Sequence, residues 1–219
     1  MQPGGMLGFM SDAAPQPAQS PVAEQTPVVD PFVYSLVLQA TYLPILLGGG
    51  HLEVHGREHI PPAGTPLILA ANHRHGLDPF VLARGVPPES GRRVQFMAKR
   101  ELFVPGLGAL LRRGGTFPVD RDSQDVGSVR TALRVLQAGG TLGIFPEGSR
   151  SGGQMHGGVA LLALKGRAPV VPAGIWHSGP RWVLRLGEPL LPARGAKALL
   201  SELEREISRL SQPFGQTWG

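Results

Sequence analysis

From residue 51 onward, the hydrophobic positions switch repeatedly between two patterns. Short apolar runs bounded by glycine, proline or polar residues predict buried strands, and apolar positions three or four residues apart predict helices that cover them. Strands are expected near residues 51–57, 66–71, 94–98, 115–119, 141–145, 169–175 and 181–187, and helices near 79–85, 105–113, 123–138, 157–165 and 195–211. The alternation predicts an α/β fold with a mixed, largely parallel sheet covered by helices.

The segment at residues 31–47 has a different pattern, because it is largely apolar and carries no charge. A helix that spans a membrane needs about 20 apolar residues, and this run is shorter and contains Gln39 and Pro44. We expect residues 30–50 to form an apolar helix at a membrane interface that ends in a glycine hinge. Packing of the same helix on the core is the alternative.

The chain on either side of this segment divides clearly. Residues 1–29 are rich in Pro, Ala, Gln and Gly and show no apolar period, so we expect a disordered N-terminal segment. Residues 51–219 hold all the expected strands and the other helices. A chain of 219 residues suits one domain with a sizeable core, which we assign to 51–219.

Composition narrows the classes of function. The chain has no cysteine, which excludes disulfides, thiolate metal sites and a cysteine nucleophile. A net charge of +5 suits anionic lipid, phosphate groups or an acidic carrier protein. No zinc-finger, basic-zipper or RNA-binding pattern is present, so we expect no nucleic-acid partner.

Candidate chemistry is concentrated in one run, Asn72 to Pro79, which follows the strand expected at 66–71. Asp78 followed by Pro79 predicts a helix start with Asp78 as the N-cap, where the helix dipole keeps a carboxylate ionised. Asp78 can then accept a hydrogen bond from one nitrogen of His73 and leave the other nitrogen free as a base. A turn histidine beside a capping aspartate is the alternative that this segment alone leaves open.

Four further segments turn this pair into part of a larger pattern. In order and spacing, the chain resembles the PlsC-like glycerolipid acyltransferases, the 1-acylglycerol-3-phosphate acyltransferases, over roughly residues 51–190. Besides the H-x4-D run at His73, the resemblance rests on Lys99–Phe103, Gly115–Arg121, Phe145–Ser151 and Val170–Gly174.

The resemblance implies a glycerol-3-phosphate acyltransferase-like fold and an activity. A fatty acyl group would move from a thioester of coenzyme A or of acyl carrier protein to the free hydroxyl of lysophosphatidic acid, giving phosphatidic acid, with no bound cofactor. A lysophospholipid acceptor implies work at an anionic membrane surface, and we expect a peripheral or monotopic protein on the cytoplasmic face of the cell membrane.

The resemblance also implies roles for individual residues. His73 would be the base and Asp78 its orienting partner, so that the acceptor hydroxyl attacks the thioester directly. Arg121 would bind the acceptor phosphate, because its planar fork of donors suits phosphate. A surface arginine paired with Asp120 or Asp122 is the alternative. Lys99 would add positive charge there, and of the neighbours Lys99 and Arg100 we expect Lys99 to point inward.

The segment after the strand at 141–145 leaves alternatives open. Glu147 would hold a glycerol hydroxyl or hold its own loop together, and Arg150 would bind phosphate or pair with Glu147. Gly148 completes the candidate substrate site.

Competing functions remain at this point. The acceptor would instead be glycerol 3-phosphate, another lysophospholipid or a lyso-aminolipid, or the chain would be a non-catalytic lipid- or carrier-binding protein on the same fold. We expect no metal site, because the binuclear H-x-H-x-D-H pattern, counted from His73 and His75, needs its aspartate one position before Asp78 and a histidine directly after the aspartate, whereas Asp78 is followed by Pro79.

Overall fold

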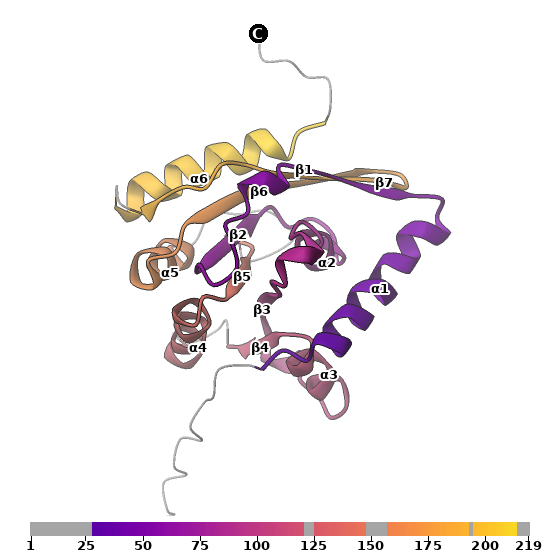
Figure 1. The fold of residues 1–219 in the computed structure, drawn as a ribbon, viewed down its shortest axis with the longest axis horizontal. Coiled ribbons are helices and arrows are strands. Elements are labelled where there is room, and N and C mark those ends of the chain that lie inside the picture. The colour runs from indigo at the N-terminus through magenta and orange to yellow at the C-terminus, as the bar shows by residue number, and fades with distance from the viewer. Residues whose placement is uncertain (1–27, 121–124, 148–156, 193–194, 214–219) are drawn as a thin grey trace, which may run out of the picture.

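The computed structural model describes residues 28–120, 125–147, 157–192 and 195–213. The predicted disorder of residues 1–29 falls almost wholly outside these ranges and stays a prediction. In the described part, a seven-stranded sheet has the order β1-β7-β6-β2-β5-β3-β4 (Figure 1). The strands are β1 (His51–His55), β2 (Leu67–Ala71), β3 (Val94–Lys99), β4 (Thr116–Val119), β5 (Thr141–Ile144), β6 (Val170–Ser178) and β7 (Arg181–Leu186).

The helices match the predicted segments. They are α1 (Pro31–Leu47), α2 (Asp78–Ala83), α3 (Leu107–Arg113), α4 (Val126–Gln137), α5 (Gly158–Gly166) and α6 (Ala196–Leu210). Three short 3-10 turns at Arg57–His59, Pro88–Ser90 and Arg100–Leu102 were not anticipated. All strand pairs are parallel except the β6–β7 hairpin, so the mixed, largely parallel sheet is confirmed.

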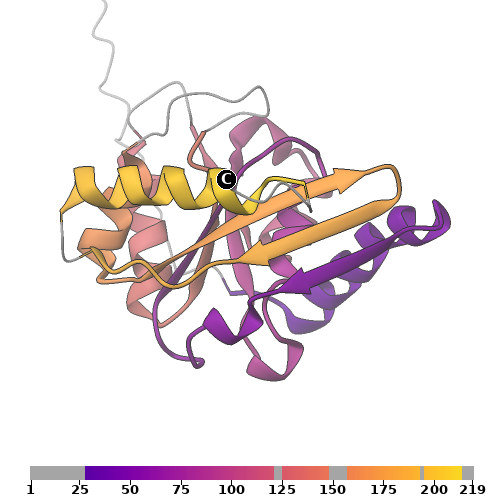
Figure 2. The ribbon, with the colours of Figure 1, turned by 90° about the horizontal axis from the view of Figure 1, so that it is seen from above.

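The sheet is covered on both faces, which explains why its central strand is apolar throughout. All five residues of β2 are buried, with Ile68 and Ala70 facing the core under α4, α5 and α6, and Leu67, Leu69 and Ala71 facing the core under α2 and α1. Figure 2 shows β1 and the β6–β7 hairpin side by side at one edge of the sheet, and α6 packs mainly against β6.

Helix α1 packs on the domain and is not a detached anchor. Val33, Tyr34 and Ile45 are buried, and the Tyr34 hydroxyl accepts a hydrogen bond from the backbone N–H of Val94 at 3.0 Å. The opposite side of the helix stays exposed. One side of α1 therefore packs on the core, as the alternative predicted, while contact of the exposed side with a membrane stays a prediction.

The expected glycine hinge is a tight helix end. The N–H groups of Gly48, Gly49 and Gly50 donate to carbonyls in the last turn of α1. A Cβ at Gly50 would lie 2.1 Å from the Pro180 carbonyl oxygen, so the chain at Gly50 packs closely on the β6–β7 turn. In the described part of the chain, no helix has the length and apolar character needed to cross a bilayer.

Candidate active site

The predicted site residues that the structure describes lie near the carboxyl ends of the parallel strands, which we call the carboxyl edge of the sheet. Strands β2, β5, β3 and β4 are parallel neighbours, so their carboxyl ends lie together, where ligands bind in open α/β sheets. His73 follows β2, Glu147 follows β5, and Lys99 is the last residue of β3. The other predicted positions, Arg121, Gly148 and Arg150, lie outside the described residues.

His73 and Asp78 form the predicted pair. Nδ1 of His73 lies 2.9 Å from Oδ2 of Asp78, whose side chain is 1% exposed. The same oxygen accepts the backbone N–H groups of Arg74 and His75, each at 2.6 Å. Asp78 therefore gathers the loop around a single carboxylate oxygen.

These contacts define the protonation of the imidazole. A backbone N–H can only donate, so Oδ2 of Asp78 is an acceptor, and His73 must donate from Nδ1. The neutral ring then carries its free electron pair on Nε2, for which the described residues provide no hydrogen-bond partner. The tautomer follows from the hydrogen-bond network, and it is the one a general base needs.

The predicted helix cap at Asp78 is wrong by one residue. Helix α2 begins at Asp78 with Leu77 in the N-cap position, and no side chain caps it. The Asp78 carboxylate instead turns back to the 73–75 backbone, because the loop offers it two N–H groups and an imidazole.

Two residues that support His73 have no assigned role in the sequence prediction. The His73 ring stacks on Phe145 with ring centroids 4.3 Å apart and planes 23° apart, and Phe145 in turn lies parallel to Phe96 of β3 at 6.3 Å. Asn72 is buried and exchanges two hydrogen bonds of 2.8 Å with the backbone of Ile175, which extends the pairing of β2 with β6 through a side chain. The one signal for Asn72 in the sequence was its position as a polar residue directly after an apolar strand.

The other described site residues differ from expectation. Lys99 is exposed. It lies three positions after Phe96 in β3, so the two side chains are on opposite faces of the sheet, and the ring stack under His73 is on the face of Phe96. The expected inward direction of Lys99 is therefore not observed. Glu147 is partly buried, and its Oε2 is fully buried with no hydrogen-bond partner among the described residues.

The histidines of β1 belong to an ion-pair group at the sheet edge. Glu53 lies 2.9 Å from both Arg181 Nε and His51 Nε2, and the hydrogen bond from Arg181, followed by that from His51, lowers the pKa of Glu53 to about 2. Among the described residues, no three His, Cys, Asp or Glu side chains converge as metal ligands would.

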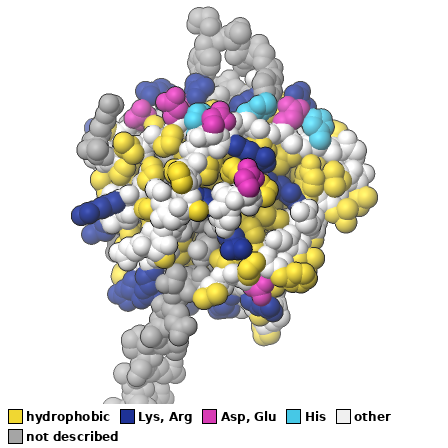
Figure 3. Space-filling model, viewed as in Figure 1, with side chains coloured by type: hydrophobic (Ala, Val, Ile, Leu, Met, Phe, Trp, Pro, Cys, Tyr) yellow, Lys and Arg dark blue, Asp and Glu magenta, His cyan; other side chains and the backbone are white. Residues whose placement is uncertain are grey.

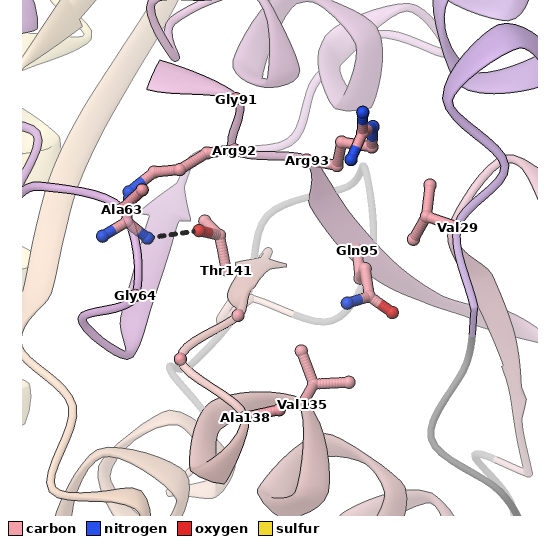
Figure 4. A pocket seen from close by; sticks show the side chains of 12 residues that line it. Val29, Ala63, Gly64, Gly91, Arg92, Arg93, Gln95, Val135, Ala138 and Thr141 are labelled. Atoms are coloured by element: carbon pink, nitrogen blue, oxygen red, sulfur yellow. Dashed lines mark hydrogen bonds between the residues drawn. The ribbon is translucent and has the colours of Figure 1, made fainter.

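A cavity of about 320 Å³ lies at the amino-terminal ends of β3 and β5, opposite the carboxyl edge (Figure 4). It is lined by residues that precede or begin β3 and β5, among them Arg92 and Thr141, and so lies at the ends of these strands remote from His73. Arg92 donates to the carbonyls of Pro61, Pro62 and Thr65 and to the Thr141 hydroxyl. This arginine ties the loop before β2 to the sheet and is structural.

The fold and this site define a class of enzyme. A histidine oriented by a buried aspartate, with its second nitrogen open at the carboxyl edge of an α/β sheet, is suited to removing a proton from a hydroxyl group. A sequence model described as acyltransferase matches residues 51–176, and the chain belongs to this acyltransferase family.

Individual relatives agree with the family. The chain is 30% identical to the 1-acyl-sn-glycerol-3-phosphate acyltransferase of Bacillus subtilis, over 84% of this chain and all of the relative, and 28% identical to that of Streptococcus pneumoniae, over 76% and 69%. The fold matches the crystal structure of the 1-acyl-sn-glycerophosphate (LPA) acyltransferase PlsC from Thermotoga maritima with a TM-score of 0.65 and 22% identity, over 86% of this chain and 82% of that one.

Proposed function

We propose that this protein transfers a fatty acyl group from an acyl thioester to the free hydroxyl of lysophosphatidic acid, giving phosphatidic acid for phospholipid synthesis. The names of its relatives support the acceptor. The observation that carries the chemistry is the His73–Asp78 pair, whose hydrogen bonds leave Nε2 of His73 free at the carboxyl edge.

The reaction needs no nucleophile from the enzyme. His73 Nε2 takes the hydroxyl proton while the hydroxyl oxygen bonds to the thioester carbonyl carbon, and Asp78 stabilises the imidazolium that forms. Collapse of the tetrahedral intermediate breaks the carbon–sulfur bond, and the imidazolium returns its proton to the leaving thiolate. General-base assistance of this kind contributes roughly 10²–10⁴-fold in rate.

The acceptor would be held by residues that follow the neighbouring strands. We assign its phosphate to Arg121, with Lys99 and Arg150 adding charge, and its glycerol part to Glu147 beside Gly148. The exposure of Lys99 suits a contact with a headgroup that stays at the membrane surface, and the partly buried Glu147 follows β5 at the same ends of the strands, where a glycerol hydroxyl would donate to its carboxylate. The donor is a thioester of coenzyme A or of acyl carrier protein, both anionic partners for a protein of net charge +5.

We assign membrane contact to a surface that we call the α1–α3 apolar surface. It holds most of the exposed large apolar side chains of the described residues, namely Phe32, Leu36, Leu43, Leu46 and Leu47 of α1, and Leu102, Val104, Leu107 and Leu110 in and before α3. In Figure 3, apolar side chains gather over α1 and α3, with basic side chains nearby.

The charges around this surface suit an anionic bilayer. Arg112 and Arg113 are exposed at the end of α3, and Lys99 and Arg100 are exposed where β3 leads into Leu102. Residues 102–110 begin three positions after Lys99, which ends β3 at the carboxyl edge. A bilayer docked on the α1–α3 apolar surface would therefore lie beside the acceptor site. We place the reaction on the cytoplasmic face, where carrier-bound thioesters would be within reach.

An acceptor and donor panel tests the function. Purified protein in detergent would be given lysophosphatidic acid, glycerol 3-phosphate, another lysophospholipid or a lyso-aminolipid, each with acyl-CoA and with acyl carrier protein thioester. We expect phosphatidic acid from lysophosphatidic acid, lost in His73→Ala and retained in His51→Ala, which removes an exposed histidine of β1. Acylation of a different acceptor only would reassign the substrate. Turnover by folded His73→Ala would reject the base, and failure with every pair would favour a binding protein.

A further inference from the structure

In the loop that carries the catalytic pair, His75 makes three contacts with the residues at the other end of the loop. Its backbone N–H donates to Asp78 Oδ2 at 2.6 Å, and its carbonyl accepts the N–H of Asp78 at 3.1 Å. Its side chain makes a third contact, because Nδ1 lies 3.1 Å from the backbone N of Leu77. All three contacts link His75 to the two residues at the far end of the loop.

The contact with Leu77 depends on the protonation of His75. The Leu77 N–H can only donate, so Nδ1 of His75 must be unprotonated, and a neutral ring then carries its proton on Nε2. The two histidines of the loop are thus opposite tautomers, since His73 carries its proton on Nδ1. A protonated His75 has a donor on both nitrogens and loses the bond to Leu77.

The ring of His75 is held from outside the loop by two aromatic side chains. Its centroid lies 5.1 Å from that of Trp182 on β7 and 5.4 Å from that of His177 on β6, both edge to face. His177 stacks on Trp182 at 4.5 Å. This packing fixes the direction in which Nδ1 points and links the loop to the β6–β7 hairpin.

We propose that His75 is a positioning residue that holds the Asp78 end of the loop through its unprotonated Nδ1, and that protonation of His75 releases this end and weakens catalysis. The proposal rests on the proposed acyltransferase function for its kinetic readout. The charged and titratable groups around the ring are His73, Arg74 and Asp78 on its own loop and His177 on β6, while Trp182 on β7 does not titrate.

Two substitutions separate the acceptor from the rest of the ring. His75→Asn supplies a side-chain oxygen that accepts the N–H two residues ahead, as asparagine does in turns, and it does not titrate. His75→Ala supplies no acceptor. At pH 8 we expect His75→Ala to lower kcat roughly 3–10-fold with little change in KM, as for the loss of one hydrogen bond, and His75→Asn to restore most of it. An asparagine variant as slow as the alanine variant would overturn the proposal, because ring packing would then be what matters.

The pH profile tests the proton. Protonated His75 lacks the acceptor for Leu77, as His75→Ala does, so its protonation should cost the wild type about the same 3–10-fold. We therefore expect the ratio of kcat/KM in His75→Asn to that in the wild type to rise roughly 3–10-fold as the pH is lowered along the acid limb, and to stay constant for the control His51→Asn. A constant ratio for His75→Asn would refute the proton release.

A third measurement is independent of the reaction. Hydrogen exchange of the Leu77 amide should be faster in His75→Ala and slow in the wild type and His75→Asn at neutral pH. If no acceptor is acylated, the proposed function fails while this exchange pattern still decides whether His75 holds the loop. Unchanged protection of Leu77 in His75→Ala would overturn the positioning role.

Discussion

Asp78 accepts its hydrogen bonds through a single oxygen, Oδ2. Oδ2 accepts the imidazole N–H of His73 and two backbone N–H groups, while Oδ1 is buried without a partner among the described residues. Because two backbone N–H groups point at Oδ2, any side chain that replaces Asp78 must place an oxygen there. At the residue scale, Asp78 therefore contributes to the site in two ways: its oxygen orients the His73 ring, and its negative charge stabilises the imidazolium.

Asp78→Asn should separate them. Its amide oxygen is expected to occupy the Oδ2 position, so His73 keeps its tautomer, but the negative charge opposite the imidazolium is lost. We expect kcat to fall roughly 10²-fold or more, with the melting temperature close to that of the wild type. Steady-state kinetics beside a thermal melt measures this. Wild-type turnover in a folded variant would exclude a role for the Asp78 charge.

Arg121→Ala should act on the acceptor. If Arg121 holds the phosphate, the KM for lysophosphatidic acid should rise well above its wild-type value with a smaller change in kcat. Arg121→Lys should restore only part of the loss, because a point charge does not reproduce a fork of donors. An unchanged acceptor KM in Arg121→Ala would move the phosphate site to Lys99 or Arg150.

At the element scale, three strands support His73, the proposed base. Phe96 on β3 and Phe145 after β5 form a row of rings that ends on His73 after β2. The row passes over Gly143 of β5, where a Cβ would lie 2.1 Å from the Phe96 ring. Gly143 leaves room for the ring of Phe96, its partner on β3, and so sets how close to the sheet the rings under His73 lie.

Gly143→Ala should therefore disturb both stability and turnover. We expect destabilisation of about 1–3 kcal/mol from overpacking, and a fall in kcat of roughly tenfold or more if the ring row shifts. The matched control is Gly158→Ala in α5, where no atom lies within 4 Å of the new Cβ. Wild-type kcat in Gly143→Ala would show that the row does not position His73.

Helix α1 is tied at its start by Asp30. Its carboxylate accepts the N–H groups of Phe32 and Val33 and lies 2.7 Å from Arg113 at the end of α3. The hydrogen bond from Arg113, together with those from the α1 backbone, lowers the pKa of Asp30 below its ordinary value of 3.8. The tie therefore depends on the ionised carboxylate.

A carboxylate with a lowered pKa in the folded state stabilises above its unfolded pKa and loses this contribution as the pH falls towards the folded pKa. Asp30→Asn can still cap α1 but cannot ionise. We expect the wild type to melt at a higher temperature than Asp30→Asn at pH 6, and the gap to close as the pH falls below about 4. Thermal melts at pH 6, 4 and 3 measure this, and a constant gap would contradict the lowered pKa.

At the scale of the whole molecule, the α1–α3 apolar surface and the carboxyl edge lie next to each other. Lys99 ends β3 at the edge, and Leu102 begins the apolar stretch three residues later. Since α1 also contributes buried core residues, removing it would test folding as much as membrane binding. Substitution of its exposed side alone is the cleaner test.

A fourfold variant, Leu36→Gln, Leu43→Gln, Leu107→Gln and Leu110→Gln, should lose binding to vesicles that contain anionic lipid. Its melting temperature and its activity on a short-chain, soluble acceptor should be retained, because all four side chains are exposed. Cosedimentation measures the binding. The control is Leu161→Gln with Leu164→Gln, two exposed leucines of α5 under the other face of the sheet. Wild-type binding by the fourfold variant, with a change from dimer to monomer, would assign the surface to a second copy of the chain.

The sequence by itself determined the elements of the fold and the His73–Asp78 pair. Strand and helix periods depend on neighbours along the chain, and a histidine and an aspartate five positions apart in one loop need little tertiary structure to meet. The cap predicted at Asp78 was wrong, because loop N–H groups compete with the helix for the same carboxylate.

Tertiary structure decided what surrounds the pair. Phe145 reaches His73, and Asn72 reaches Ile175, only because β2 lies between β5 and β6. The strand order follows from burying both faces of the sheet, which a one-dimensional pattern does not encode. The same holds for the outward direction of Lys99 and for α1, whose apolar residues are divided between the core and the surface by the position of α2 and α3 beneath it.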